Sequence, residues 1–134
     1  MTRLRLGPVT IHFASKDGGP ESHVTGWFIE WKAVATLCLL RFSPGSRDAY
    51  HSHAFNCVSV VLRGLLSEHC MGYNHTTEYA ASPLPFCTYR STLHKVIGVG
   101  TSWVLSLRGP WTNTWREWVP GLGYRTLGRG RVEL

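Results

Sequence analysis

The sequence predicts an all-β protein made of one domain, and three observations support that fold class. Helical periodicity is almost absent along the 134 residues, whereas short runs of β-branched and aromatic residues recur. The 14 glycines and seven prolines punctuate these runs, as expected for short strands joined by turns. A chain of this length suits a single core, so we expect one domain across 1–134. Many short antiparallel strands in one domain indicate a sandwich or a small barrel.

The expected strands are the apolar and β-branched runs that lie between turn residues. KDGGPES near the start and SPGS at 43–46 have turn chemistry, and MGYNHTTEYAASPLP is a longer connection. Gly64 separates two apolar runs, which predicts a tight antiparallel hairpin between 55–63 and 65–70. The other expected strands are 9–13, 27–31, 35–42, 86–89, 94–99, 102–108 and 115–119.

The charge and the termini limit the expected partners. The net charge is +6, and three arginines lie in GYRTLGRGRVEL, which we interpret as a basic C-terminal tail over 120–134. No helix-turn-helix pattern, aromatic RNA-binding signature or paired Cys-x-x-Cys accompanies this charge, so we do not expect a nucleic-acid partner. The start, MTRLRLGPVTIHF, lacks the apolar core of a signal peptide, and no apolar run approaches the ~18 residues of a membrane span. We therefore expect a cytoplasmic protein with no membrane partner.

Two histidines one residue apart introduce the stretch GSRDAYHSHAFNCVSVVLRG. In a strand, His51 and His53 point to the same face, and Cys57 shares their parity. Ala54, Val58, Val60 and Leu62 have the opposite parity and are apolar, so we expect the mixed set to line a cavity inside a small barrel. The alternative is that both histidines are exposed to solvent. His94, in a second strand-like run, is a third imidazole that could complete a facial metal site.

The spacing of this stretch resembles the first motif of the cupins. Gly45, His51, His53 and Gly64 match its glycine, histidine pair and second glycine, while Cys57 stands where the motif has glutamate. The resemblance implies a double-stranded β-helix, or jelly-roll, barrel that binds a metal, with His94 as the later ligand. HSHAFNCVSVVLRGLLSEH, YRSTLHKV and WVLSLRGPWTNTW are also similar to small cupin-like proteins of phages and prophages, across about 42–118. On this basis 1–34 would supply N-terminal strands and 35–119 the barrel with its site.

The resemblance also implies a function class. Three imidazoles on one divalent transition metal ion leave positions for a substrate or dioxygen. We expect a mononuclear non-haem metal enzyme of dioxygenase type that acts on a small polar substrate, with Fe(II) favoured and Zn(II), Ni(II) or Mn(II) as alternatives. Two other readings stay open: a non-enzymatic small-molecule-binding or regulatory protein, and a metal-free sugar isomerase or epimerase. The last uses a histidine base with an acidic partner, for which Asp48 and Glu68 are the nearby acids.

Several further residues have two interpretations. Glu68 is a candidate catalytic general base or a partner of a metal ligand, but it could also be solvated. Cys57 is either a fourth metal ligand or part of the cavity wall. The tryptophans near the C-terminus could form an aromatic wall or belong to a core or an interface. His69, Cys70 and His75 form an alternative metal cluster, and apolar residues of the N-terminal strands would suit a homodimer interface.

Overall fold

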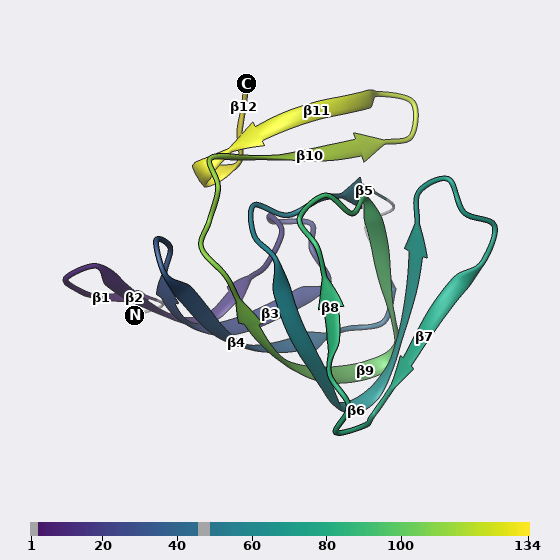
Figure 1. Cartoon of the computed structure of the whole chain (residues 1–134), viewed down its shortest axis with the longest axis horizontal. Coiled ribbons are helices and arrows are strands. Elements are labelled where there is room, and N and C mark those ends of the chain that lie inside the picture. Colours follow the sequence, from purple (N-terminus) through teal and green to yellow (C-terminus); the bar gives the residue numbers. More distant parts are fainter. Residues whose placement is uncertain (1–2, 46–48) are drawn as a thin grey trace.

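The computed structural model describes residues 3–45 and 49–134, and strands make up most of it (Figure 1). This confirms the predicted all-β fold class. A single 3₁₀ turn, η1 (Arg129–Arg131), interrupts the strands in the described residues. The strands are β1 (Arg3–Leu6), β2 (Val9–Lys16), β3 (Val24–Trp31), β4 (Ala35–Phe42), β5 (Tyr50–His51), β6 (Cys57–Cys70), β7 (Thr76–Ala80), β8 (Phe86–Thr88), β9 (His94–Arg108), β10 (Thr114–Val119), β11 (Gly123–Gly128) and β12 (Val132–Glu133).

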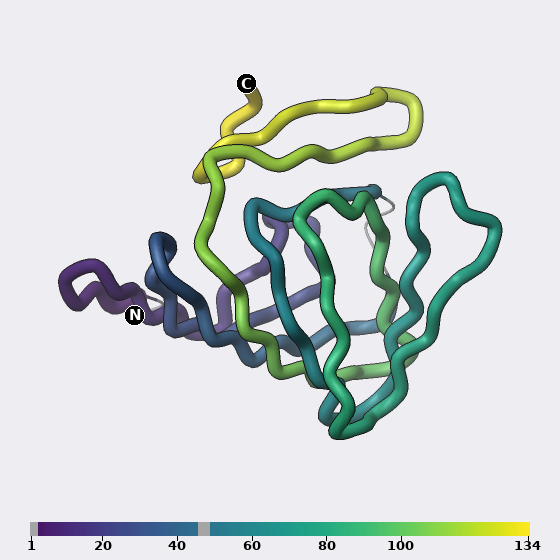
Figure 2. The backbone as a smooth tube through the Cα atoms, viewed as in Figure 1, coloured from purple at the N-terminus to yellow at the C-terminus, as the bar shows by residue number. Residues whose placement is uncertain are grey.

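Two long strands hold the molecule together, because β6 and β9 each take part in two layers (Figure 2). One layer has the order β1-β2-β3-β4, continued by the second half of β9, the first half of β6 and β8. The other contains β7, the second half of β6, the first half of β9, and then β5, β10, β11 and β12. All pairings between these strands are antiparallel, so the chain folds as two layers around a shared interior.

The predicted hairpin at Gly64 is wrong. The chain continues through Gly64 within β6, and β9 likewise runs unbroken through the region where we expected two strands. Register shifts on both sides of Arg63 mark β-bulges, where the backbone of Gly64 has a φ of 92°. A Cβ on Gly64 would lie 2.8 Å from the Cα of Ser102, and the Ser102 hydroxyl bonds both the N–H and the carbonyl of Leu65 at 3.0 Å. Gly64 is therefore needed where β6 bends from one layer into the other, and not at a hairpin turn.

The basic C-terminal segment lies within the sheet. β11 pairs with β10 from Thr114↔Gly128 to Val119↔Gly123, and β12 pairs with β11. Arg125 and Arg131 donate hydrogen bonds to the carboxylate of Glu117, at 2.6 and 3.2 Å. Since Glu117 in β10 is almost fully buried, these two arginines anchor the C-terminal segment within the layer that contains β5.

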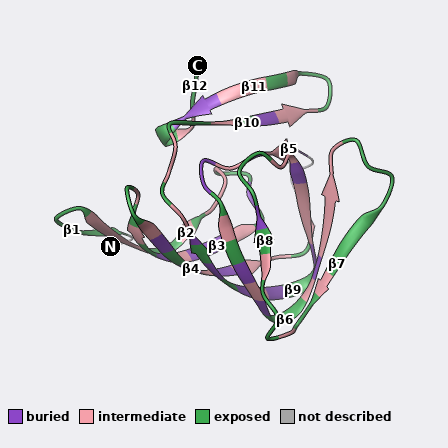
Figure 3. Ribbon diagram, viewed as in Figure 1, coloured by how far each residue is buried: buried purple, intermediate pink, exposed green. Residues whose placement is uncertain are grey.

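The core lies between the layers, where the inward-facing residues meet (Figure 3). The four cysteines are free thiols, and burial raises the pKa of Cys38 to about 12. Among the described residues, no helix has the length and apolar character needed to cross a membrane. The core cluster consists of Phe28, Cys38, Leu40, Val61, Leu66 and Val104.

Candidate metal centre

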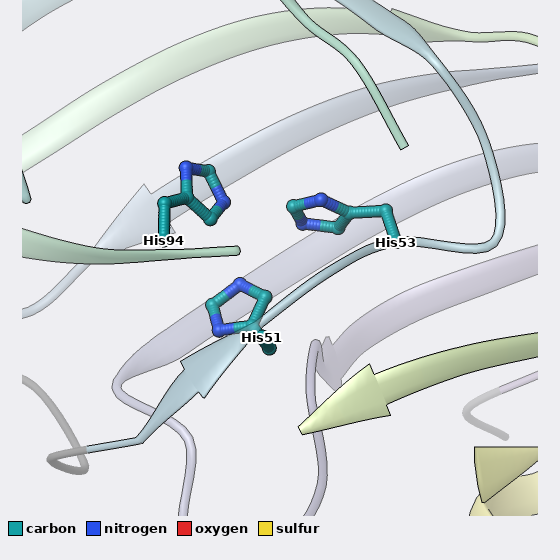
Figure 4. A group of neighbouring side chains, drawn as sticks. All are labelled: His51, His53 and His94. Carbon is teal, nitrogen blue, oxygen red and sulfur yellow. The ribbon is translucent and has the colours of Figure 1, made fainter. Parts of the chain in front are cut away.

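Three histidines converge at one end of the interior (Figure 4). The ring centroids of His51 and His53 are 4.9 Å apart, and His94 lies 4.9 and 5.0 Å from them. Each ring offers one nitrogen, and the three nitrogens lie within 4.8 Å of one another. They are the only group of this kind among the described histidines, cysteines and acids. The structure thus brings together the three residues that the sequence analysis predicted as metal ligands.

The sheet explains why these residues meet. His51 is the second residue of the short strand β5, which lies between β9 and β10, and it pairs directly with His94. His94 is the first residue of β9, more than forty positions later in the chain. His53 follows β5 by an even step, so its side chain stays on the same side. The solvent-exposed alternative is wrong, since all three histidines line the interior cavity.

A carboxylate orients one of the three rings. Glu68 Oε2 accepts a 2.6 Å hydrogen bond from Nδ1 of His94, and the Tyr79 hydroxyl donates to the other carboxylate oxygen at 3.3 Å. The bond to His94 is the main cause of the lowered pKa of Glu68, which keeps this carboxylate ionised. Because Nδ1 carries the proton, the lone pair of His94 is on Nε2, which is buried and has no hydrogen-bond partner. This is the arrangement in which a carboxylate fixes a metal-ligating imidazole.

His53 is held in its neutral form. Its burial, followed by the charges of His51, His94 and Arg108, places the pKa of His53 well below the usual value. Its Nδ1 atom is buried without a hydrogen-bond partner. Metals bind the neutral imidazole, so burial prepares this donor for coordination. The donor set therefore fits a transition metal ion, while its binding stays a prediction.

Cys57 lies in the cavity wall and does not belong to the histidine group. Its sulfur lies 4.0 Å from the hydroxyl of Ser59, and burial raises the pKa of Cys57. A thiol with a raised pKa is mostly protonated, and a protonated thiol is a poor metal ligand. Its position and its raised pKa therefore favour a role for Cys57 in the cavity wall. Asp48, the other acid considered for a metal-free reaction, lies outside the described residues.

The alternative cluster is not assembled. The Tyr50 hydroxyl lies 2.5 Å from Nδ1 of His69, and Nε2 of the same ring lies 2.7 Å from the carbonyl of Tyr73. A carbonyl only accepts, so Nε2–H donates to it and Nδ1 accepts from the tyrosine. Both nitrogens of His69 are therefore engaged. Cys70 and His75 form no metal-ligating group with it.

A cavity of about 510 Å³ extends from the three histidines through the interior. Trp111 and Trp115 line it, with Phe55 next to Trp111 at 5.3 Å between ring centroids, so part of the expected aromatic wall is present. Trp103 instead stacks on Trp27, at 5.7 Å, and is absent from the cavity lining.

Two charged residues in this region were not anticipated from the sequence. Arg108 lines the cavity between Phe28 and Phe55, 6% exposed, and donates to both oxygens of Asp17 at 2.6 and 3.4 Å. Glu117 is directly opposite His51 in the β5–β10 register and is 1% exposed. Both residues lie in predicted strands, at positions that point toward the interior. A charged residue at such a position is unusual, and this signal could have identified Arg108 and Glu117 as candidate site residues.

Comparisons with known proteins identify the fold class. Scans of the sequence against family models and against curated proteins gave no significant match. Solved structures with a similar fold include proteins described as cupins or as having a double-stranded β-helix domain, so the chain has the fold class expected from the resemblance.

Three of these structures illustrate the similarity. An RmlC-like cupin from Shewanella frigidimarina shares 16% identity, with 82% of this chain and 95% of that chain covered and a TM-score of 0.55. A sugar phosphate isomerase of the cupin superfamily from Silicibacter pomeroyi shares 11%, with 84% and 80% covered and a TM-score of 0.55. A conserved protein with a double-stranded β-helix domain from Klebsiella pneumoniae shares 15%, with 72% and 85% covered and a TM-score of 0.56. At these identities the similarity shows the fold alone.

Proposed function

We propose that this chain is a mononuclear metalloprotein in which His51, His53 and His94 bind one divalent transition metal ion. The observation that carries the proposal is the convergence of three imidazoles with ligand nitrogens within 4.8 Å of one another. The similarity of the motifs to phage-type cupins supports the same ligand set. Imidazoles accept Fe(II), Zn(II), Ni(II) or Mn(II), and we favour Fe(II) because three protein ligands leave three positions of an octahedral ion open.

We further propose an enzyme of dioxygenase type, in which Fe(II) would supply the redox chemistry with dioxygen. Glu68 acts through His94 in this proposal, since its carboxylate holds the proton on Nδ1 and so keeps the Nε2 lone pair toward the centre. This positioning role replaces the general-base role considered from the sequence. The buried ring of Phe55 and the half-buried ring of Trp111 exclude water from one side of the cavity.

The charges of the cavity favour a small anionic substrate. The lining contains four cationic side chains, Lys16, Lys32, Arg108 and Arg131, against three carboxylates. Asp17 pairs with Arg108, whereas Glu30 and Glu68 accept hydrogen bonds from the imidazoles of His12 and His94. Lys16 donates a hydrogen bond to the carbonyl of Ser22 and Lys32 lies over the ring of Trp111, and neither forms an ion pair with a carboxylate of a described residue. A ligand with a carboxylate or phosphate would compensate this excess of positive charge.

One observation favours a second candidate, a metal-free isomerase or epimerase. The Glu68–His94 pair is a histidine with an acidic partner at 2.6 Å, which is the arrangement that such a base requires. A solved structure with this fold is described as a sugar phosphate isomerase. A binding protein without catalysis is the third reading, and the fold does not choose among them.

Metal analysis and oxygen consumption separate these functions. Protein purified without an affinity tag is expected to contain close to one equivalent of metal, and His51→Ala, His53→Ala and His94→Ala are each expected to lose it. Anaerobically Fe(II)-loaded protein is then mixed with a panel of small chelating anions, such as keto acids and amino acids, in an oxygen electrode. Dioxygen uptake that depends on both iron and substrate supports the oxygenase. Bound iron with flat traces favours the binding protein, and a metal-free preparation that epimerises sugar phosphates favours the second candidate.

A further inference from the structure

A buried guanidinium lies close to the candidate metal centre. Arg108, the last residue of β9, lines the cavity with its side chain only 7% exposed. Its guanidinium carbon lies 5.2 Å from the ring centroid of Phe28 and 4.6 Å from that of Phe55. The centroid of the Phe55 ring lies 5.2 Å from that of His53. One aromatic ring therefore separates this positive charge from a candidate metal ligand, and the two phenyl rings hold the guanidinium in place.

The counterion of Arg108 comes from the connection between β2 and β3. The carboxylate of Asp17 accepts hydrogen bonds from Nη1 and Nη2 of Arg108, at 3.4 and 2.6 Å. The strand register places Arg108 in one row with Thr36 and Glu30, whereas Asp17 follows the end of β2 at the other end of that layer. Both residues of the ion pair line the cavity. The pair therefore spans the cavity, and strand pairing does not impose it.

The carboxylate of Asp17 can leave Arg108 while the backbone of the connection stays in place. The Asp17 side chain is 29% exposed, so it lies at the edge of the cavity and reaches solvent. Its backbone has separate partners, because its N–H donates to the carbonyl of Val24 at 3.0 Å and its carbonyl accepts from the hydroxyl of Ser22. A change of side-chain rotamer is therefore enough to move the carboxylate into water.

We propose that Arg108 binds the carboxylate of the substrate, and that Asp17 occupies this position until the substrate displaces it. The inference rests on the proposed function, since it treats the ligand of the cavity as a substrate. The Asp17 contact shows which anion the guanidinium accepts, namely a planar group whose two oxygens meet two N–H donors. The phenyl rings beside Arg108 favour a ligand with an apolar body, so the substrate class is a small apolar carboxylate and not a phosphate. Only a ligand that replaces both hydrogen bonds offsets the loss of Asp17, which selects against neutral molecules.

Isothermal titration calorimetry of the metal-free protein with benzoate measures this site independently of metal binding. Asp17→Asn should tighten benzoate binding about tenfold or more, because the ligand no longer has to break a charge-assisted hydrogen bond. Arg108→Met should abolish benzoate binding. Glu30→Gln is the matched control, since Glu30 also lines the cavity but pairs with His12, and it should leave the affinity unchanged. Inorganic phosphate at the same ionic strength should bind the wild type more weakly than benzoate does.

Far-UV circular dichroism and urea titrations follow the folding of each variant. Asp17→Asn leaves a buried guanidinium without its counterion, so it should be less stable than the wild type, and excess benzoate should restore the stability where sodium chloride does not. If Arg108→Met does not fold, Arg108→Lys takes its place, because lysine keeps the charge and loses the paired donors.

Four results would each overturn the inference. They are an Asp17→Asn chain that binds benzoate no more tightly than the wild type or stays unfolded in benzoate, benzoate binding that survives replacement of Arg108, and a preference for phosphate. A chain that binds metal but lacks this benzoate site overturns the inference alone. A chain with the expected benzoate pattern and no bound metal supports the carboxylate site and contradicts the proposed metalloprotein.

Discussion

Replacing Glu68 by glutamine tests the role of the carboxylate beside the candidate metal centre. The two side chains of the Glu68–His94 pair are 12% and 4% exposed and 2.6 Å apart, so the hydrogen bond is charge-assisted and largely removed from water. Glutamine keeps the size and the acceptor oxygen but removes the negative charge. Loss of such a partner typically lowers metal affinity roughly 10–100-fold, which corresponds to about 1.4–2.7 kcal/mol.

The measurement is a competition titration of the apo protein against a chelator of known affinity. Glu78→Gln is the matched control, because Glu78 is an exposed glutamate on the neighbouring strand β7 and should leave the affinity unchanged. His94→Ala sets the limit of full loss. Should Glu68→Gln bind metal as tightly as the wild type while His94→Ala does not bind, the reasoning about orientation is refuted.

Three further outcomes are expected. The pKa of His53 is lower in the folded protein than in the unfolded chain, so the unfolded chain binds the proton first as the pH falls. The free energy of unfolding of the apo protein should therefore decrease by about 1.4 kcal/mol per pH unit below roughly pH 6.5. Urea titrations at several pH values measure this dependence, and His53→Gln should remove it. Cys57→Ala should keep its metal, with a loss of at most a few kcal/mol in unfolding free energy, and metal loss would identify the thiol as a ligand. Gly64→Ala should destabilise by more than about 2 kcal/mol, because its Cβ would meet Ser102, whereas Gly72→Ala, with a similar φ and open space, should cost less; equal melting temperatures would contradict this.

The sequence predicted the three histidines of the candidate metal centre more accurately than it predicted how the surrounding strands are connected. The even spacing of His51 and His53 determines that they share a face in any extended chain, and that parity is a local property. Gly64 is different, because a positive φ suits both a hairpin and a bulge. Whether Gly64 forms a hairpin or a bulge depends on its contact with Ser102 in β9, nearly forty residues away in the sequence. The residues around Gly64 do not predict that contact.

Long-range pairing also explains what was missed in the site. Glu117 lies opposite His51 only because β5, two residues long, lies between β9 and β10. The strand containing Glu117 was expected, but its neighbour was not, since a two-residue strand has no periodicity to detect. Arg108 was likewise placed in a predicted strand, while its counterion Asp17 lies in a segment read as a turn. In both cases the sequence identified the elements and left their neighbours undetermined.

The position of β10 has a consequence for the synthesis of the protein. A nascent chain that has emerged only through Arg108 already contains all three histidines, but it lacks one of the two strands that hold β5 in place. β5, which contains His51, then has a single partner strand. β5 has both of its neighbouring strands only after β10 has left the ribosome. If the histidines bind a metal, its capture would therefore be a late, largely post-translational event, and termination before β10 would yield a chain with all three candidate ligands but only one strand beside β5.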